Sequence, residues 1–407
     1  MKLCFLVGSM AISGGTYVIV QHAAYLRDHG FDVTLAVQEP FSALTLAWHD
    51  EASALRCIPI AEAKKEYFDL VIATWWKTVF ELSHFQAKQY AYFVQSIESN
   101  FYPEEEVPLR FLVETTYRFP ILYVTEATWI QQYLAEKFGQ AAALVRNGIR
   151  KDIYTPSGPA IAPRNLARPP RILVEGHFGV SFKNTALSIR LAREAGARDI
   201  WVLTGSPVSW LPGVNRVFSQ VPMITTPQIY RSCDILVKLS TVEGMFGPPL
   251  EIFHCGGTAI VFDVTGHDEY IVDGVNACVI SRGDADRVVS ILQRLLSDRD
   301  TLSQLQQGAL QTAAAWPSWE ESSAQFHQWV SGCLQGSTPD RSDLAAMTEQ
   351  AFADYSHDEQ LRLAQNPAII RRHKLSALAS RFPRSVIRKV KQLEAIGEVA
   401  LGRRTAY

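Results

Sequence analysis

Short apolar segments alternate with longer segments of helical spacing along most of this chain. The apolar runs that have the length of strands are 3–7, 33–37, 70–74, 91–95, 121–125, 172–175, 200–204, 217–219, 234–239 and 258–263. Apolar residues recur with helical spacing over 16–29, 78–85, 108–117, 126–138, 285–296, 301–312 and 319–330. Strands that alternate with helices predict parallel sheets covered by crossover helices.

A proline-rich stretch separates two such alternating runs. Residues 150–170 contain five prolines and no apolar periodicity, which is typical of a linker. We therefore expect an α/β protein with two doubly wound, Rossmann-like domains facing a cleft, and a helical C-terminal tail. The predicted limits are 1–160 for the first domain, 161–335 for the second and 336–407 for the tail.

Length and composition indicate a large protein with no membrane-spanning helix. A chain of 407 residues exceeds one typical domain. No window approaches the roughly 18 uninterrupted apolar residues of a spanning helix, and the first residues, MKLCFLVG, lack the layout of a signal peptide. Six scattered cysteines form no CxxC pair. We therefore expect a reduced cytoplasmic protein with no metal site, no cofactor and no nucleic-acid partner.

The net charge of −2 hides an uneven distribution. Residues 371–404 carry a net charge of +8, and the rest of the chain carries −10. A basic amphipathic helix that starts near Pro383 would suit an anionic membrane surface. Packing of this helix on the second domain, or on the acidic residues 340–359, is the alternative. Its apolar face is predicted from residues that recur at helical spacing: Val386, Ile387, Val390, Leu393, Ile396, Ala400 and Leu401.

The clearest chemistry lies in the segment Glu243-Gly-Met-Phe-Gly-Pro-Pro-Leu-Glu251, which follows an apolar strand. The Gly247-Pro248 pair indicates a helix start, because the N–H that proline lacks would have no partner at that position. Backbone N–H groups near Phe246 and Gly247 would then face an anion at the start of the helix. A diphosphate flanked by two hydroxyl-bearing sugars would suit a site with a carboxylate on each side. A nucleotide-sugar is such a ligand.

This segment resembles the E-x7-E motif of the retaining glycosyltransferases of family four, which have the GT-B fold. The spacing is kept, while Met245-Phe246-Gly247 replaces the usual Phe-Gly-Leu. The variant is close to subgroups of surface-polysaccharide synthesis, rhamnosyltransferases among them. The resemblance also implies that the helix beginning near Ser318 crosses back to the first domain. Residues after the motif fit the family as well: Gly266, Glu269, Asp273, Gly274 and Asn276.

The resemblance assigns roles on the donor side. Glu243 would hold hydroxyls of the transferred sugar, and Glu251 those of the ribose. Lys183 matches the lysine that the family places on the donor diphosphate, whereas His177 stands where the family has an arginine. Lys238, inside an apolar strand, would replace that arginine or extend its amine from an edge strand. The predicted catalytic pair is Glu243 and Lys183, and the predicted donor-binding set is Gly14, Gly15, His177, Lys183, Lys238, Glu243, Gly244, Phe246, Gly247 and Glu251.

Side chains at predicted strand ends suggest an acceptor site in the first domain. Trp76 follows one strand, and Gln95 and Glu98 follow the next. Open α/β sheets place ligands at these carboxyl ends, where an aromatic ring would stack on a sugar, although packing is the commoner role of such rings. The loop after the first strand contains Gly14 and Gly15, which let the backbone approach a ligand closely. It lacks the G-x-G-x-x-G spacing of a dinucleotide-binding dehydrogenase.

We therefore expect a retaining, metal-independent hexosyltransferase. It would move a sugar from a nucleotide-diphosphate sugar to a glycan or lipid-linked glycan acceptor in surface-polysaccharide synthesis. The resemblance implies that the leaving phosphate takes the acceptor proton. No Asp-x-Asp segment suggests a donor metal, and Asp298-Arg-Asp300 is expected at a helix terminus. Two alternatives stay open: a nucleotide-sugar 2-epimerase of the same fold, and a non-catalytic subunit that binds a sugar nucleotide.

Overall fold

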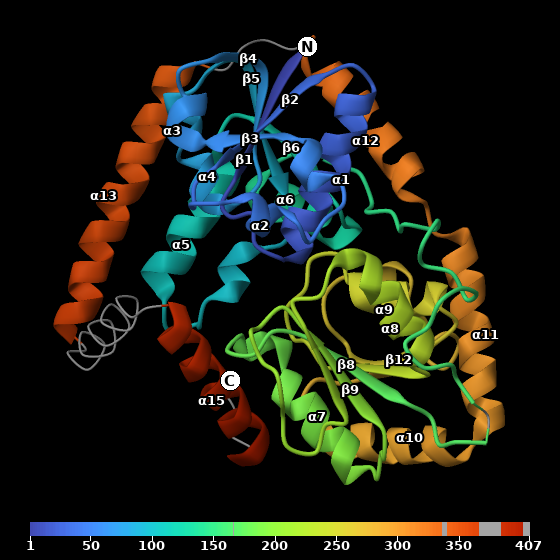
Figure 1. Ribbon diagram of the computed structural model, residues 1–407. Helices are drawn as coiled ribbons and strands as arrows, with labels where there is room; N and C mark the ends of the chain where they lie inside the picture. The colour runs from blue at the N-terminus through green and yellow to red at the C-terminus, as the bar shows by residue number, and fades with distance from the viewer. Residues whose placement is uncertain (166, 336–339, 366–383, 402–407) are drawn as a thin grey trace. The chain divides into compact units, whose positions relative to one another are not determined.

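The computed structural model describes residues 1–165, 167–335, 340–365 and 384–401. The chain forms two compact units. Unit 1 comprises Met1–Asn147 with Glu320–Pro383, and unit 2 comprises Gly148–Trp319 with Arg384–Tyr407. Each unit contains one parallel β-sheet with helices on both faces, which is the doubly wound arrangement expected from the sequence (Figure 1). The predicted limits at residues 160 and 335 stay a prediction, because the two units are compact groups of packed residues and do not by themselves define domain boundaries.

Unit 1 contains a seven-stranded sheet in the order β3-β2-β1-β4-β5-β6-β7. Its strands are β1 Lys2–Val7, β2 Asp32–Val37, β3 Arg56–Pro59, β4 Tyr67–Ala73, β5 Gln86–Val94, β6 Leu122–Thr125 and β7 Ala142–Leu144. Its α-helices are α1 Gly14–Asp28, α2 Ala43–Leu46, α3 Ile60–Ala63, α4 Trp76–Val79, α5 Val107–Thr115, α6 Thr128–Phe138, α12 Trp319–Cys333 and α13 Arg341–Gln365. Phe326 of α12 stacks on His22 of α1 with ring centroids 4.2 Å apart, so these two helices share one face of the sheet.

Unit 2 contains a six-stranded sheet in the order β10-β9-β8-β11-β12-β13. Its strands are β8 Ile172–Glu175, β9 Ile200–Thr204, β10 Arg216–Ser219, β11 Ile235–Lys238, β12 Thr258–Phe262 and β13 Cys278–Ile280. Its α-helices are α7 Thr185–Glu194, α8 Thr226–Ser232, α9 Gly247–His254, α10 Ala285–Ser297, α11 Arg299–Ala315 and α15 Arg384–Leu401. Helices α7 and α10 bury one face of the sheet, and α8 and α9 bury the other (Figure 1).

Helix starts follow from local capping residues. Ser13 precedes α1, and its hydroxyl accepts a hydrogen bond from the N–H of Thr16 at 3.1 Å. Asp298 precedes α11 and accepts from the N–H of Thr301 at 3.0 Å, which confirms the expected helix-terminal role of this aspartate. Seven short 3-10 turns complete the described secondary structure: Ala52–Ala54, Leu82–His84, Glu98–Phe101, Thr116–Arg118, Ser181–Lys183, Met223–Thr225 and His267–Glu269.

All the predicted strands are present, two of them (β8 and β9) with the predicted ends and the others with shifted ends, but the sequence pattern misses β3, β7 and β13. These strands have three or four residues each and lie at sheet edges, where half-buried and exposed positions replace a clear apolar run. The predicted helix over 78–85 is wrong in form. Two short turns, α4 and the 3-10 turn Leu82–His84, replace it and together bury Val79, Leu82 and Phe85 in the core.

Gly148 stands at the point where the chain passes from unit 1 to unit 2. Ile149 and Ser318 form a parallel β-bridge next to it, and the N–H of Trp319 donates to the carbonyl oxygen of Ile149 at 3.2 Å. A Cβ atom on Gly148 would lie 2.3 Å from the backbone of Ser318. Only glycine allows this close approach of the outgoing and returning segments.

The predicted tail contains two described helices, which pack on different units. Helix α13 contacts α5 and buries Leu344 and Ala351 in the core of unit 1. Helix α15 contacts α7 and buries Ala395 and Val399 in the core of unit 2, as the packing alternative predicted. The predicted start at Pro383 and the basic residues at 371–381 and 403–404 lie outside the described residues. Among the described helices, none has the length and hydropathy to cross a membrane.

Candidate functional site

The candidate site of unit 2 lies where β8 and β11 end. The chain runs from β8 through β9 to β10 and then returns to the other side of β8 at β11. The two strands therefore border the topological switch point of the sheet, where open α/β proteins bind ligands. Val174 pairs with Val237, which places Glu175 and Lys238 side by side at the carboxyl ends of these strands.

Four charged side chains form three consecutive ion pairs at this point. Lys238 Nζ lies 2.5 Å from Glu175 Oε2 and 3.5 Å from Glu243 Oε1. Lys183 Nζ donates to Glu243 Oε2 at 2.8 Å. The side chains of Lys238 and Glu243 are only 2% and 8% exposed, so each charge depends on its partners for stabilisation. We call Glu175, Lys238, Glu243 and Lys183 the charge chain.

Two hydrogen bonds fix the loop of Lys183 against the loop that follows β11. Asn184 precedes α7 in a left-handed conformation (φ 48°), and its Nδ2 donates to the carbonyl oxygen of Leu239 at 2.9 Å. The N–H of Thr241 donates to the carbonyl oxygen of Phe182 at 2.9 Å. Asparagine tolerates left-handed backbone angles better than most residues. The backbone therefore holds Lys183 close to its glutamate partner.

The charge chain keeps its buried members ionised. Burial by itself would raise the pKa of Glu243, but the ammonium groups of Lys183 and Lys238 hold this pKa below its ordinary value. Burial would lower the pKa of Lys238, and the carboxylates of Glu175 and Glu243 raise it above its ordinary value instead. One oxygen, Glu243 Oε1, is buried, and the Lys238 ammonium lies 3.5 Å from it, which is long for a hydrogen bond. It can accept a hydrogen bond from a ligand hydroxyl.

Glu251 lies one turn inside α9, beside the charge chain. Hydroxyl groups of Tyr230 and Tyr154 form hydrogen bonds with its carboxyl group. Burial raises the pKa of Glu251 to about 7, and the hydrogen bond from Tyr230 opposes this shift. The negative charge of Glu175 also raises the pKa of Glu251, and the positive charge of Lys238 lowers it. Both carboxylates of the E-x7-E motif therefore belong to one site, but only Glu243 is held firmly in its charged form.

The start of α9 differs from the expected phosphate cradle. The Gly247-Pro248 helix start is confirmed. The N–H of Gly247, however, donates to the carbonyl oxygen of Met245 at 3.0 Å, because Phe246 turns the backbone tightly (φ −82°, ψ 77°). The prediction of a free N–H at Gly247 is therefore wrong. Phe246 is fully buried, and Gly244 lies in the loop between Glu243 and this turn.

His177 lies at the same edge of the sheet but carries no charge near neutral pH. Burial lowers the pKa of its imidazole; Glu175 opposes the shift, and Lys183 and Lys238 add to it. The ring packs against Gly205, where an added Cβ atom would lie 2.3 Å from Cε1 of His177. The structure brings His177 to the site as a neutral hydrogen-bonding group, unlike the arginine of the family pattern.

The predicted residues of unit 1 form a separate group. Gly14 and Gly15 are the first two residues of α1, and a Cβ atom on Gly15 would lie 3.2 Å from Gln95 Oε1. Gln95 Oε1 is buried and has no hydrogen bond among the described residues, while Nε2 lies 3.4 Å from the carbonyl oxygen of Thr74. Gly15 and Gln95 therefore meet near the ends of β4 and β5.

Trp76 and Glu98 are packed inside unit 1. The carboxylate of Glu98 accepts hydrogen bonds from the backbone N–H of Trp76 at 2.8 Å and from the hydroxyl of Tyr92 at 2.6 Å. Trp76 Nε1 donates to the hydroxyl of Tyr102 at 3.1 Å. Burial raises the pKa of Glu98 to about 7. Both side chains are buried, which agrees with the packing role that is the commoner one for rings such as Trp76. An acceptor role for Trp76 and Glu98 stays a prediction.

Glu175 is a member of the charge chain that the sequence motif does not include. The signal for it is that two apolar strands, ILVE and ILVK, end in charges of opposite sign. Their side-by-side register brings these two charges together. The sequence does not show that β8 and β11 are neighbours, because β9 and β10 separate them along the chain. The pair therefore becomes visible only with the strand order.

Comparison with known proteins gives a match over part of the chain. Residues 214–312, about a quarter of the sequence, match the family model Glycosyl transferases group 1. The matched segment includes Lys238, Glu243 and Glu251, but not Glu175 or Lys183. No curated protein matches the sequence.

Solved structures match over most of the chain. HepE from Anabaena, in complex with UDP and glucose, has 15% identity, covers 82% of this chain and 100% of its own, and has a TM-score of 0.65. WaaG, a glycosyltransferase of lipopolysaccharide biosynthesis, has 12% identity, the same coverage and a TM-score of 0.63. Sucrose-phosphate synthase from Thermosynechococcus elongatus has 14% identity, covers 82% and 99%, and has a TM-score of 0.61. This likeness shows that the chain has two Rossmann-like domains of the GT-B type and a helical C-terminal region.

Proposed function

We propose that this protein is a retaining, metal-independent glycosyltransferase that moves a hexosyl group from a nucleotide-diphosphate sugar. The acceptor would be a glycan or lipid-linked glycan of a surface polysaccharide. The match of residues 214–312 to glycosyl transferases group 1 supports the reaction class. The structures of HepE contain UDP, glucose or UDP-glucose, which supports a nucleotide-sugar as the donor here. The residues Met245-Phe246-Gly247 within the E-x7-E motif support a rhamnosyltransferase-like subgroup.

The observation that carries this proposal is the charge of the Glu243 carboxylate and the way in which its two oxygens are held. Lys183 and Lys238 hold its carboxylate charged, but the contact of Lys238 with Oε1 is long, at 3.5 Å, whereas Lys183 contacts Oε2 at 2.8 Å. A buried carboxylate oxygen with one long ion pair keeps the capacity to accept a further hydrogen bond, so a ligand that supplies a hydroxyl would be favoured there. Sugar hydroxyls supply such donors. Glu243 would therefore orient the transferred sugar at the switch point of the sheet.

The two lysines would have different roles. The side chain of Lys183 is 22% exposed, so its ammonium can turn from Glu243 toward a diphosphate and stabilise the departing charge. The side chain of Lys238 is 2% exposed and lies between Glu175 and Glu243, so it would hold these two carboxylates in place. We therefore assign Lys238 a positioning role, in place of the direct phosphate contact predicted from the sequence.

Glu251 would bind the ribose of the donor in its charged form, with Tyr154 and Tyr230 fixing its carboxylate. His177 would add at most one neutral hydrogen bond to the diphosphate. The leaving phosphate would take the proton of the acceptor hydroxyl, and no protein general base is assigned.

The test is a pair of substitutions at the motif carboxylates. Glu243→Gln and Glu251→Gln should each lower kcat/KM for sugar transfer by about a hundredfold or more. Glu251→Gln should also weaken binding of the free nucleotide, which a thermal-shift screen of UDP, GDP, TDP and ADP would first identify. Glu243→Gln should leave nucleotide binding unchanged. Exposed Glu194 on α7 offers the matched control Glu194→Gln. Wild-type activity in both motif variants would contradict the assignment.

The same assay separates the two alternatives. A nucleotide-sugar 2-epimerase would convert the donor alone, with no acceptor present. A non-catalytic subunit would bind the nucleotide and turn over nothing with any donor and acceptor pair. We expect product only when donor and acceptor are both present.

Metal independence is a separate prediction. Lys183 supplies the positive charge that a divalent cation would otherwise provide at the leaving diphosphate. Transfer activity should therefore be unchanged after dialysis against EDTA, measured with and without added Mg²⁺ or Mn²⁺. Loss of activity with EDTA and recovery with either cation would contradict it.

The proposal extends to an anionic membrane surface on the cytoplasmic side, where a lipid-linked acceptor would lie. Val386, Val390 and Leu393 of α15 are 38%, 45% and 67% exposed. Their spacing puts them on one stripe, opposite the buried Ala395 and Val399. Exposed basic residues, Arg388, Lys389 and Lys391, lie on the same helix. An apolar stripe with neighbouring basic side chains suits anionic lipid headgroups.

A further inference from the structure

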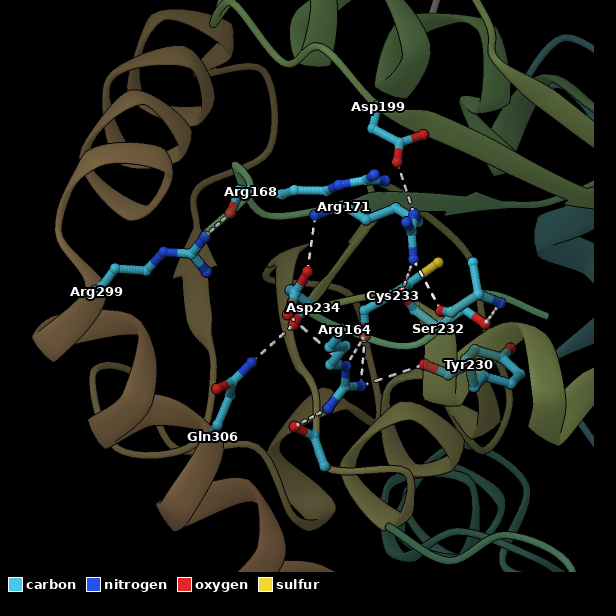
Figure 2. A network of polar contacts seen from close by, with 12 residues as sticks. Arg164, Arg168, Arg171, Asp199, Tyr230, Ser232, Cys233, Asp234, Arg299 and Gln306 are labelled. Atoms are coloured by element: carbon cyan, nitrogen blue, oxygen red, sulfur yellow. Dashed lines mark hydrogen bonds and ion pairs between the residues drawn. The ribbon is translucent and has the colours of Figure 1, made fainter. Parts of the chain in front are cut away.

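A second group of charged side chains lies at the opposite end of the strands that carry the charge chain. Figure 2 shows it at the start of β8, β9 and β11, where the end of the linker meets the sheet. The group surrounds a cavity of about 150 Å³. The cavity is lined by four arginines, two aspartates and two further residues: Arg164, Arg168, Arg171, Arg198, Asp199, Asp234, Asn165 and Pro169.

Two of these arginines are fixed parts of the fold. Arg171 is buried, and its Nε donates to Asp199 Oδ2 at 2.7 Å, while Nη1 donates to the carbonyl oxygen of Ser232 at 2.6 Å. Arg164 donates to backbone carbonyl groups of Cys233 and Gly256, with Nε 2.9 Å from the Cys233 oxygen. Figure 2 shows both guanidinium groups surrounded by these acceptors. These hydrogen bonds join the linker to the sheet, and the two guanidinium groups form a rigid, positively charged wall of the cavity.

The other two arginines have no such partners. Arg168 and Arg198 are exposed, and their side chains form no hydrogen bond or ion pair within the described part of the chain. Figure 2 shows the Arg168 side chain extended beside Arg171, toward Asp199, while its backbone oxygen accepts a hydrogen bond from Arg299. Arg299 thereby holds the linker backbone at the cavity. Arg168 and Arg198 keep their guanidinium donors available for a ligand.

The charges around the cavity do not balance. Four guanidinium groups face two carboxylates, which leaves two positive charges in excess. A phosphate group carries about −1.5 to −2 at neutral pH, and its oxygens match the planar fork of arginine. The cavity is small, with a volume of about 150 Å³, and it is partly open to solvent. Inorganic phosphate or a small phosphate ester would fit.

We propose that this cavity binds a small phosphate-bearing molecule, at a site distinct from the sugar-donor site. Arg168 and Arg198 make the direct contacts at its mouth, and Arg171 and Arg164 form the positive wall behind them. Asp199 and Asp234 keep the wall arginines in place through an ion pair of 2.7 Å to Arg171 and one of 3.7 Å to Arg164.

Trp201 provides a local reporter for this site. Its indole N–H donates to Asp199 Oδ1 at 2.8 Å, and the Arg171 guanidinium lies 4.4 Å from its ring centroid. An anion that enters the cavity will change the field at this ring. The chain can be labelled with 5-fluorotryptophan, and Trp201→Phe assigns the resonance in a fluorine NMR spectrum. Inorganic phosphate and glycerol phosphate are then titrated against chloride at equal ionic strength.

We expect either phosphate compound, and not chloride, to shift the Trp201 resonance saturably, and the tighter of the two to identify the ligand type. Arg168→Gln with Arg198→Gln should weaken binding about tenfold or more. The matched pair Arg287→Gln with Arg294→Gln, on α10, should leave it unchanged, and so should the donor-site variant Lys183→Ala. The absence of a saturable shift in the wild type would overturn the proposal. Equal affinity in the Arg168/Arg198 pair would overturn it too, as would loss of the shift in Lys183→Ala, since phosphate would then be acting from the donor site.

Discussion

At the scale of single residues, Glu251 is placed where its charge depends on pH near neutrality. Its pKa rises from an ordinary 4.5 to about 7 on folding, chiefly through burial. Below about pH 4.5 the carboxyl group is protonated in the folded and unfolded states alike, so burial of this group has no ionic cost. Between 4.5 and 7 the folded state binds more protons than the unfolded state, so the free energy of unfolding falls as pH rises.

This sign gives a prediction for Glu251→Gln. The variant lacks the titrating group, so wild-type protein should lose stability relative to the variant between pH 4.5 and pH 8, by on the order of 3 kcal/mol. Thermal unfolding midpoints of both proteins across that range measure the difference. Glu98 also has a raised pKa, but it is present in both proteins and cancels. Parallel curves across the whole range would show that Glu251 titrates normally.

Lys238 permits a second prediction at this scale. Lys238→Met removes the cation between Glu175 and Glu243 and leaves two carboxylates without it, which should cost about 3–5 kcal/mol of stability. Lys183→Met should cost less, because Lys183 is more exposed and pairs with one carboxylate. Adding Glu175→Gln to Lys238→Met removes one stranded charge and should recover part of the loss. If the double variant is no more stable than Lys238→Met, Glu175 and Lys238 are not energetically coupled.

Prediction from the sequence succeeds or fails at residues for identifiable reasons. Glu243 and Glu251 are found because a Gly247-Pro248 helix start and the E-x7-E spacing of the family resemblance occur together in one short segment. Glu175 is missed because its partner comes from a strand that lies far along the chain but adjacent in the sheet. Gly247 is misjudged because a tight turn at Phe246 uses its N–H, and such a turn leaves no distinctive pattern in the sequence.

At the scale of elements, α15 is a helix with two apolar sides. One side, with Ala395 and Val399, packs in the core of unit 2, and Gln392 accepts from the N–H of Ser209 at 2.7 Å. The other side carries the exposed stripe Val386, Val390 and Leu393. Periodicity alone merges the two sides into one amphipathic face. It predicts the helix correctly, but it does not separate the residues that pack from those that stay exposed.

The exposed stripe gives a prediction for membrane binding. Val386→Ser, Val390→Ser and Leu393→Ser together should lower the fraction of protein that floats with anionic vesicles by about tenfold. The matched control replaces three exposed apolar residues of unit 1: Leu44→Ser, Val107→Ser and Phe111→Ser. Neutral vesicles should recover little of any protein. Equal flotation of wild type and stripe variant, or no flotation of either at low salt, would eliminate the membrane role.

Short strands at sheet edges are not predicted from the sequence, because tertiary contacts and not local periodicity decide whether they form. Strand β3 has the sequence RCIP and no fully buried position, so its identity as a strand depends on hydrogen bonds to β2. Helix α13 lies in the tail that is predicted to be helical, but its sparse apolar positions do not indicate its bounds or that Leu344 and Ala351 pack in the core of unit 1. Tertiary contacts decide both elements, and local propensity does not.

At the scale of the whole molecule, the alternation of strands and helices is enough to predict two doubly wound units. The return of the chain to the first unit is expected only from the family resemblance, which places the crossing helix near Ser318, and the re-entry at Glu320 confirms it. Unit 1 is made from two separate pieces, since the chain leaves it at Asn147 and re-enters it at Glu320. The fold likeness to HepE and WaaG covers the same two-unit architecture. All seven strands of unit 1 lie within residues 1–147, and no pattern there signals that a later helix is needed to cover their sheet.

The return of α12 to unit 1 determines the order in which the parts can be completed during synthesis. Phe326 packs against Phe5, Phe93 and His22, so the part of this sheet face that α1 does not cover stays open until α12 has left the ribosome. The main body of unit 2, Gly148–Trp319, is synthesised before that and is continuous. Domains usually mature from the N-terminus onward. Here the first unit to start is finished after the body of the second, and a chain interrupted between the two crossings would present an open aromatic surface to its neighbours.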